Sequence, residues 1–193
     1  MERKYKLTDE CMQYKGHKLY RIQALRSFSN IKEGELGGYI ESEDNLSHDG
    51  MCWVYDEAKV FGNAEVCNNA KVFGNANVFG NANVFGNAKV CGKAYVHFHA
   101  KVFGNAEVSG NAEVRGDAKV YKNEDYIVFK NWWSSGRYFT WTRSNNMWKV
   151  GCFYGKGEDL IKKAYADSKE SGREYERIVK YVESILADDN YIE

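Results

Sequence analysis

The chain has 193 residues, of which 44% are apolar and 28% are charged, a balance typical of a globular protein. Its 27 basic residues equal its 27 acidic residues, so no net charge draws it toward long nucleic acid or an anionic membrane. The sequence has no apolar run of the length of a signal core or a membrane span, so we expect a soluble cytoplasmic protein.

The cysteines are odd in number and form no CxxC pair: Cys11, Cys52, Cys67, Cys91 and Cys152. This spacing fits neither a disulfide framework nor a zinc knuckle, so we predict free thiols and no bound metal or cofactor. Proline is absent, and the turns must therefore be made by glycine and asparagine.

The first 41 residues carry short alternating runs on both sides of a Lys15-Gly16 turn. We predict a β-hairpin here, followed by Gly34, Gly37 and Gly38, which lead the chain into the next segment. Residues 1–41 are expected to act as an N-terminal cap.

A six-residue repeat fills the middle of the chain. Valine recurs every six residues from Val54 to Val120, alanine follows four residues after each valine as far as Ala118, and Gly-Asn separates them in most units. Period six suits neither a helix nor a long strand, but it divides into a short strand and a two-residue corner that tolerates positive φ. Three such sides close a triangular coil of eighteen residues, with valine inside. Weaker units extend the same register back to residue 42.

This pattern resembles the hexapeptide repeat of the left-handed parallel β-helix, a family whose best-known members are acyltransferases. The resemblance implies a prism over residues 42–121. Each end of such a prism exposes unpaired backbone and apolar core, so both ends need capping segments. The predicted fold is therefore mainly β: a left-handed parallel β-helix with an N-terminal β-hairpin cap and a C-terminal α+β domain.

After Val120 the repeat stops, and residues 122–193 form the predicted C-terminal domain. Three antiparallel strands are expected at 126–129, 137–142 and 147–150, followed by two helices, the second beginning at a Ser171–Glu174 capping box. From Lys130 onward this tail is similar to uncharacterised phage and prophage proteins. That resemblance implies viral or prophage origin and a place in the bacterial host cytosol, and it implies no chemistry.

Residues eighteen apart stack on one face of the coil, so the outward rows follow by arithmetic. The rows are Phe61, Phe79, His97 and Arg115; Cys67, Phe85, Phe103 and Tyr121; and Tyr55, Phe73, Cys91 and Ser109. Two interpretations stay open, a purely structural ladder and an interface, because exposed rings in rows are costly to leave in water. We predict a homo-oligomer, most simply a trimer, held either by prism faces, with Phe85, Phe103 and Tyr121 as the column at the interface, or by the terminal helices. The acyltransferase resemblance adds trimerisation along the prism.

One unit departs from the pattern and offers the alternative catalytic residues His97, His99 and Asp117. A histidine beside a carboxylate can act as a general base. The acyltransferases that the repeat resembles use such a histidine to deprotonate an acceptor, with acyl-CoA between subunits. This repeat lacks the inserted loops that commonly build their site, and the chain's histidines lack the zinc spacing of γ-type carbonic anhydrases. We therefore predict no catalytic residues and keep the histidine pair as the alternative.

The C-terminal domain interleaves aromatic residues with arginines. Most of these rings must form the core of a small sheet, which leaves Trp132, Trp133, Arg137 and Arg143 as candidate contacts for a small nucleotide.

The function predicted from these features is that of a non-catalytic, phage-type binding or assembly module. Its task would be to antagonise a host defence by holding a host protein or a small signalling nucleotide. Two alternatives stay open, a hexapeptide-repeat acyltransferase and a structural protein of the phage.

Overall fold

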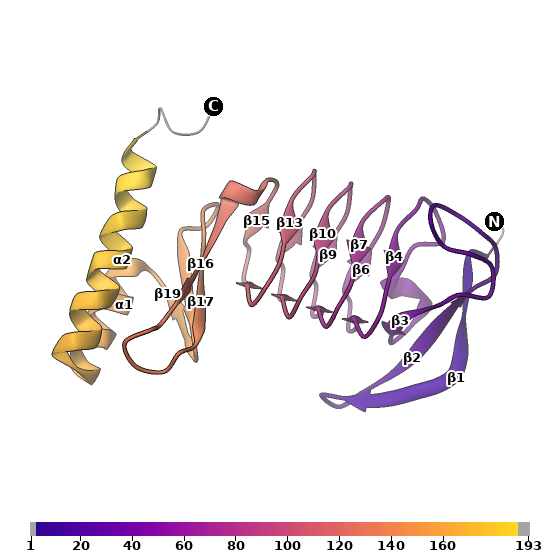
Figure 1. The fold of residues 1–193 in the computed structure, drawn as a ribbon, viewed down its shortest axis with the longest axis horizontal. Helices are drawn as coiled ribbons and strands as arrows, with labels where there is room; N and C mark the ends of the chain where they lie inside the picture. The colour runs from indigo at the N-terminus through magenta and orange to yellow at the C-terminus, as the bar shows by residue number, and fades with distance from the viewer. Residues whose placement is uncertain (1–2, 189–193) are drawn as a thin grey trace. The chain divides into compact units, whose positions relative to one another are not determined.

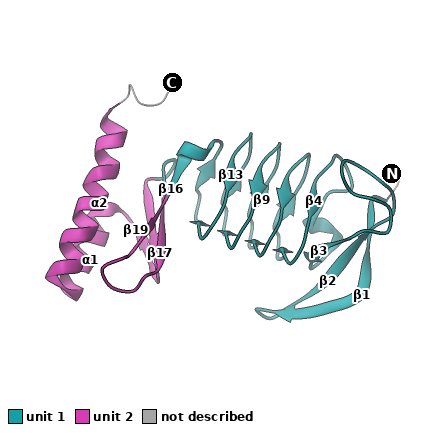
Figure 2. Ribbon diagram, viewed as in Figure 1, with its two compact units in different colours: residues 1–127, 142–145 teal, residues 128–141, 146–193 magenta. Residues whose placement is uncertain are grey.

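A computed structural model describes residues 3–188, which divide into two compact units (Figure 2). The first comprises Met1–Ile127 with Thr142–Asn145, and the second comprises Val128–Trp141 with Asn146–Glu193. None of the helices in the described part of the chain is long and apolar enough to cross a membrane.

The first unit is a β-solenoid of about five turns built from very short strands in three parallel sheets (Figure 1). Strands eighteen residues apart pair in register, as Val72 does with Val90 and Val90 with Val108. The repeat valines and alanines are almost completely buried, which confirms the interior predicted from the repeat. The strands are β4 (Trp53–Val54), β5 (Lys59–Val60), β6 (Glu65–Val66), β7 (Lys71–Val72), β8 (Asn77–Val78), β9 (Asn83–Val84), β10 (Lys89–Val90), β11 (Tyr95–Val96), β12 (Lys101–Val102), β13 (Glu107–Val108), β14 (Glu113–Val114) and β15 (Lys119–Val120).

Only the first residue of each corner takes the positive φ that the sequence suggested for both. Gly86 has φ of +71°, for example, and a Cβ there would lie 3.1 Å from the backbone nitrogen of Gly104 in the next turn. The corner asparagines instead form a side-chain ladder. Nδ2 of Asn69 donates to Oδ1 of Asn87 at 3.1 Å, and Nδ2 of Asn87 donates to Oδ1 of Asn105 at 3.2 Å.

The predicted N-terminal hairpin is confirmed: β1 (Tyr5–Tyr14) and β2 (His17–Ala24) pair antiparallel, and β3 (Leu36–Ile40) joins β2 to the solenoid. β3 pairs in parallel with β5, which places it in the sheet order β1-β2-β3-β5-β8-β11-β14.

The first turn of the solenoid is longer than the repeat. Ile40 pairs with Val60, and Leu46, after the 3-10 turn at Glu43–Asn45, bridges to Val66, so both offsets are twenty residues rather than eighteen. Ile40 and Leu46 are fully buried, whereas Ser42 and His48 are not. The expected register of the weak units was therefore wrong, because two additional residues lie between Leu46 and Val54.

Both ends of the prism are closed by residues of the first unit. At the N-terminal end, the ammonium of the fully buried Lys4 donates to the Cys52 carbonyl at 2.9 Å, and burial lowers the pKa of that lysine. At the other end, Tyr126 donates its hydroxyl hydrogen to the Glu107 carbonyl at 2.9 Å, and the Lys119 amide donates to Oγ of Ser144 at 2.7 Å.

The C-terminal sheet has four strands in sequence order, β16 (Tyr126–Lys130), β17 (Tyr138–Thr142), β18 (Met147–Val150) and β19 (Phe153–Gly155). The three-strand prediction missed β19, which is short and contains a glycine. Helices α1 (Gly157–Asp167) and α2 (Lys169–Ala187) follow.

The predicted capping box at Ser171–Glu174 is wrong. The N-cap of α2 is Ser168, whose side chain accepts a hydrogen bond from the Ser171 amide, so Ser171 lies inside the helix.

Candidate functional site

The first aromatic row, defined by Phe61, Phe79 and His97, is a stack that the N-terminal hairpin packs against. The rings of Phe61 and Phe79 lie 4.9 Å apart with an interplanar angle of 0°, and His97 stacks on Phe79 at 4.6 Å. Tyr14 meets Phe61 edge-on at 5.8 Å, and the Lys15 ammonium lies 4.8 Å from the centre of the Phe79 ring. We call this set the covered row.

The second row, Phe85, Phe103 and Tyr121, is stacked in the same way but lies on a face that the hairpin sheet does not occupy. Phe85 and Phe103 lie 5.0 Å apart, and Phe103 and Tyr121 lie 5.3 Å apart. The two phenylalanines are half-buried and Tyr121 is 57% exposed. Lys101 and Lys119 pair directly beside the row. We call this set the open row.

The corner of the coil that carries His97 and His99 does not have the contact with Asp117 that the sequence suggested. His97 is 7% exposed, and its Nε2 lies 2.9 Å from Oε1 of Glu113. His99 is exposed, and among residues 3–188 no hydrogen bond or ion pair joins it to His97 or to Asp117. The carboxylate partner of the corner is therefore Glu113, which the spacing argument missed because it considered only the corner row.

Phe98, between the two histidines, stands where other units have glycine and has φ of +61°. The Arg115 guanidinium lies 4.5 Å from the centre of its ring. Within the described residues, no group of three or more His, Cys, Asp or Glu side chains could hold a metal ion.

The four candidate nucleotide contacts of the tail are divided between the units. Arg143 is half-buried in the first unit, where its backbone amide donates to the Asp125 carbonyl. Trp132, Trp133 and Arg137 belong to the second unit. Trp132 is 73% exposed, whereas Trp133 packs edge-on against Tyr175 with ring centres 5.0 Å apart. Arg137 lines a cavity.

That cavity has a volume of about 280 Å³ and is lined by residues that the sequence argument did not single out, among them Asn131, Asp167, Ser171 and Tyr175. No short-range spacing connects these residues, because Asn131 and Tyr175 are separated by 44 positions. The signal that could have pointed to the site was the polar loop Asn131–Arg137, which places two serines and an arginine beside the aromatic residues.

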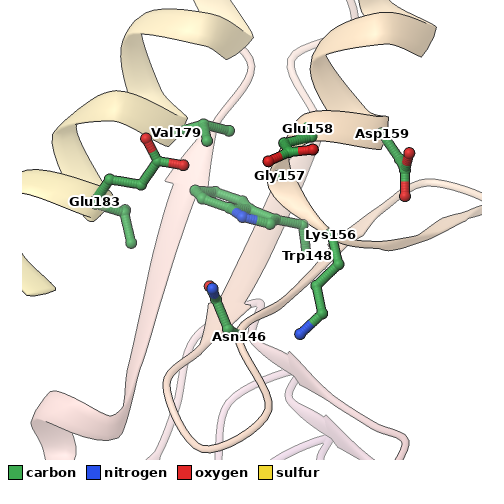
Figure 3. Close-up of a pocket in the computed structure, with 9 residues that line it drawn as sticks. Asn146, Trp148, Lys156, Gly157, Glu158, Asp159, Val179 and Glu183 are labelled. Atoms are coloured by element: carbon green, nitrogen blue, oxygen red, sulfur yellow. The ribbon is translucent and has the colours of Figure 1, made fainter.

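A second cavity of the same unit, of about 290 Å³, lies beside Trp148 and the start of α1. Figure 3 shows the Trp148 indole with Glu158 and Glu183 on one side and the Asn146 amide on the other. Trp148 is only 1% exposed, so its ring is packed against other side chains and has no free face on which a ligand could stack. The carboxylates alone do not define a ligand.

No protein-family model matches the chain. An uncharacterised acetyltransferase of Escherichia coli K12, YdcK, is 38% identical over 69 residues. The match covers 31% of this chain and 21% of the relative, so the chain spans about a fifth of the length of the curated relative that it matches. The solenoid and this relative agree with the hexapeptide-repeat resemblance.

Proposed function

We propose that this protein is a non-catalytic binding and assembly module in which the open row holds a second copy of the chain. The observation that carries the proposal is the contrast between the two rows, since the hairpin packs on one and leaves the other. Phe85 and Phe103 are half-buried and Tyr121 is 57% exposed, so a monomer leaves part of each phenylalanine ring and most of Tyr121 in contact with water. A second copy that covers the row would remove this aromatic area from water.

The regularity of the coil supports binding over catalysis. From β4 to β15 each six-residue unit passes directly into the next without an inserted loop, so the faces are flat. Catalytic sites are usually concave and exclude water, and flat faces suit a protein partner better.

Light scattering tests the proposal. The wild-type protein should have the mass of an oligomer, most simply a trimer, and Phe103→Glu should reduce it to one chain without changing the circular dichroism spectrum. Phe73→Glu is the matched control, because it places the same charge at the same position of the repeat on another face. A wild-type mass of one chain, or an oligomer that survives Phe103→Glu, would remove the open row as the interface.

A finer form of the proposal names a host-side partner. Its support is the resemblance of the tail sequence to phage and prophage proteins. The role would be to antagonise a host defence by holding a host protein or a small signalling nucleotide. Native mass spectrometry of the protein purified from its natural host would identify such a partner, and a preparation containing only copies of this chain would count against it.

The second candidate function is acyl transfer, favoured by the relative named as an acetyltransferase and by the hydrogen bond between His97 and Glu113. It predicts saturable binding of acetyl-CoA and loss of turnover in His99→Ala with little change in melting temperature. We expect neither binding nor turnover, and calorimetric binding of acetyl-CoA would overturn the non-catalytic proposal.

A further inference from the structure

The cavity beside Arg137 gathers four separate segments of the second unit. They are the loop after β16 with the first two residues of β17, the end of β18 with the turn before β19, the last residue of α1 and the first turns of α2. Side chains with hydrogen-bonding or ionic groups line it from all four: Ser134, Arg137, Cys152, Asp167, Ser171 and Tyr175. A cavity in which polar groups from distant segments converge is the usual architecture of a small-ligand site.

Tyr175 supplies a buried donor to this cavity. The residue is 7% exposed, and its hydroxyl oxygen accepts a hydrogen bond from Nδ2 of Asn131 at 3.0 Å. Among residues 3–188, no acceptor is found for the hydroxyl hydrogen of Tyr175 itself. Burial raises the pKa of this phenol, and the Asp167 carboxylate adds to that effect, so the hydroxyl keeps its proton at neutral pH. A buried donor without an acceptor is costly unless a ligand supplies one.

Asn131 also fixes the loop that forms one wall. Its Oδ1 accepts hydrogen bonds from the amide and the hydroxyl of Ser134 at 2.9 and 3.0 Å. The residue is 5% exposed, and its backbone carbonyl accepts from the Gly136 amide at 2.8 Å. The loop is therefore held in one conformation, and Arg137 follows it directly.

Arg137 brings the one positive charge among the residues that line the cavity. Its guanidinium lies over the turn between β18 and β19, where a Cβ on Gly151 would be 3.8 Å from Nη1. Within the described residues no carboxylate forms an ion pair with Arg137. An arginine without a partner, beside several hydroxyl donors, is suited to a phosphate or carboxylate group of a ligand.

We propose that this cavity binds a small phosphate monoester no larger than a mononucleotide. Arg137 would hold the phosphate, the hydroxyls of Tyr175 and Ser171 would donate to its oxygens, and Asp167 would accept from a hydroxyl or amino group elsewhere on the ligand. The donors outnumber the acceptors, which favours an oxygen-rich anion, and 280 Å³ lies at the lower limit for small-molecule sites. This inference rests on the small-nucleotide form of the proposed function, which it deepens by placing the ligand in the second unit, and it is independent of the open row.

Titration calorimetry with adenosine 5′-monophosphate, guanosine 5′-monophosphate and ribose 5-phosphate tests the proposal. Adenosine is the matched probe without a phosphate, and glutamate is the carboxylate probe. At least one phosphate monoester should bind saturably, and about tenfold or more tightly than adenosine and glutamate. Absence of saturable binding by all three phosphorylated probes, or tighter binding of glutamate, would overturn the phosphate assignment.

Variants locate the site. Arg137→Ala should weaken binding on the order of 10- to 100-fold, as expected for the loss of a charged hydrogen-bonded pair. Tyr175→Phe should weaken it less, and Arg173→Ala, an exposed arginine of α2 outside the cavity, should leave it unchanged. Binding that is equal in Arg137→Ala and wild type would overturn the proposal. The mass of the oligomer is measured on the same samples, so failure here is distinguishable from failure of the open-row interface.

Discussion

The covered row and the open row occupy the same position of the repeat on two faces of one solenoid. Their first pairs stack almost identically, with ring centres 4.9 Å apart in Phe61–Phe79 and 5.0 Å apart in Phe85–Phe103. Yet Phe61 is 2% exposed, whereas Phe85 and Phe103 are only half-buried and Tyr121, after the last solenoid strand, is 57% exposed. The additional burial of Phe61 comes from outside the repeat, because Tyr14 and His17 of the hairpin pack on it.

This contrast distinguishes two contributions to the stability of an aromatic row, stacking and removal from water, which cannot be told apart from the repeat sequence alone. Stacking between neighbouring turns, worth about 0.2–1 kcal/mol per pair, is set by the repeat and exists in both rows. Removal of rings from water depends on which other segment lies over the face, and in the part of the chain that the structure describes the hairpin lies over the covered row and not over the open row. A row that the chain leaves exposed is therefore where a partner can gain the most from binding.

The largest expected effect is on the core that both rows share. Val84 is fully buried, so Val84→Asp would place an unpaired carboxylate inside the prism and cost on the order of 3–5 kcal/mol or prevent folding. Asn83→Asp is the matched control, because the adjacent side chain is half-buried and faces outward. Denaturant unfolding measures both variants, and a wild-type midpoint for Val84→Asp would contradict the assigned register.

The next effect tests the contrast directly. Phe61→Ala should lower the free energy of unfolding by about 3–5 kcal/mol, as for a buried phenylalanine, because a cavity would form beneath the hairpin. Phe103→Ala should cost about 1–2 kcal/mol at protein concentrations where the chain is monomeric, because the ring is only half-buried. Equal losses in the two variants would mean that the hairpin adds nothing to the burial of the first row.

Much of the solenoid could be predicted from the sequence, because each turn repeats the one before. The inward valines and the stacked rows followed from counting in steps of six and eighteen. The same counting gave the wrong inward residues for the first turn. Two additional residues there shift the register, so that Ile40 and Leu46 point inward. Counting also could not foresee that the hairpin packs on Phe61, since that contact depends on the tertiary fold and not on a period.

The second unit was less predictable because its contacts are non-local. The strands β16 to β18 and both helices follow from local patterns. The start of α2 was predicted wrongly, because both Ser168 and Ser171 are good N-cap residues and the sequence pattern favoured Ser171, whereas the N-cap is Ser168. The cavity depends on Asn131 meeting Tyr175 across 44 residues, and no spacing rule connects them. Arg137 was identified because an arginine beside aromatic residues is a recognisable local pattern.

A smaller effect concerns pH and the hairpin. Burial, and then a hydrogen bond with Tyr95, raises the pKa of Tyr14 from 10.0 to about 12. The folded state therefore favours the neutral phenol, so its contribution to stability is complete below pH 10 and is lost as pH rises toward 12. Between those values the free energy of unfolding should fall more steeply in the wild type than in Tyr14→Phe. Parallel pH profiles for the two proteins would contradict the packing of Tyr14, which is half-buried, against the covered row.

The smallest effect is expected at Phe98, the corner residue that follows His97, and it should be a gain. A residue other than glycine at φ of +61° costs about 1–2 kcal/mol, whereas the contact of this ring with Arg115, at 4.5 Å, returns about 0.5–1 kcal/mol where it is exposed. Phe98→Gly, which restores the corner found in the neighbouring units, should therefore raise the free energy of unfolding by about 0.5 kcal/mol. Asn68→Gly is the matched control, because Asn68 has φ of +58° at a corresponding corner without such a ring. Loss of stability in Phe98→Gly together with a gain in Asn68→Gly would mean that the packing of Phe98 on His97 and Arg115 outweighs its backbone strain, and that the corner is held in a strained conformation by its side chains.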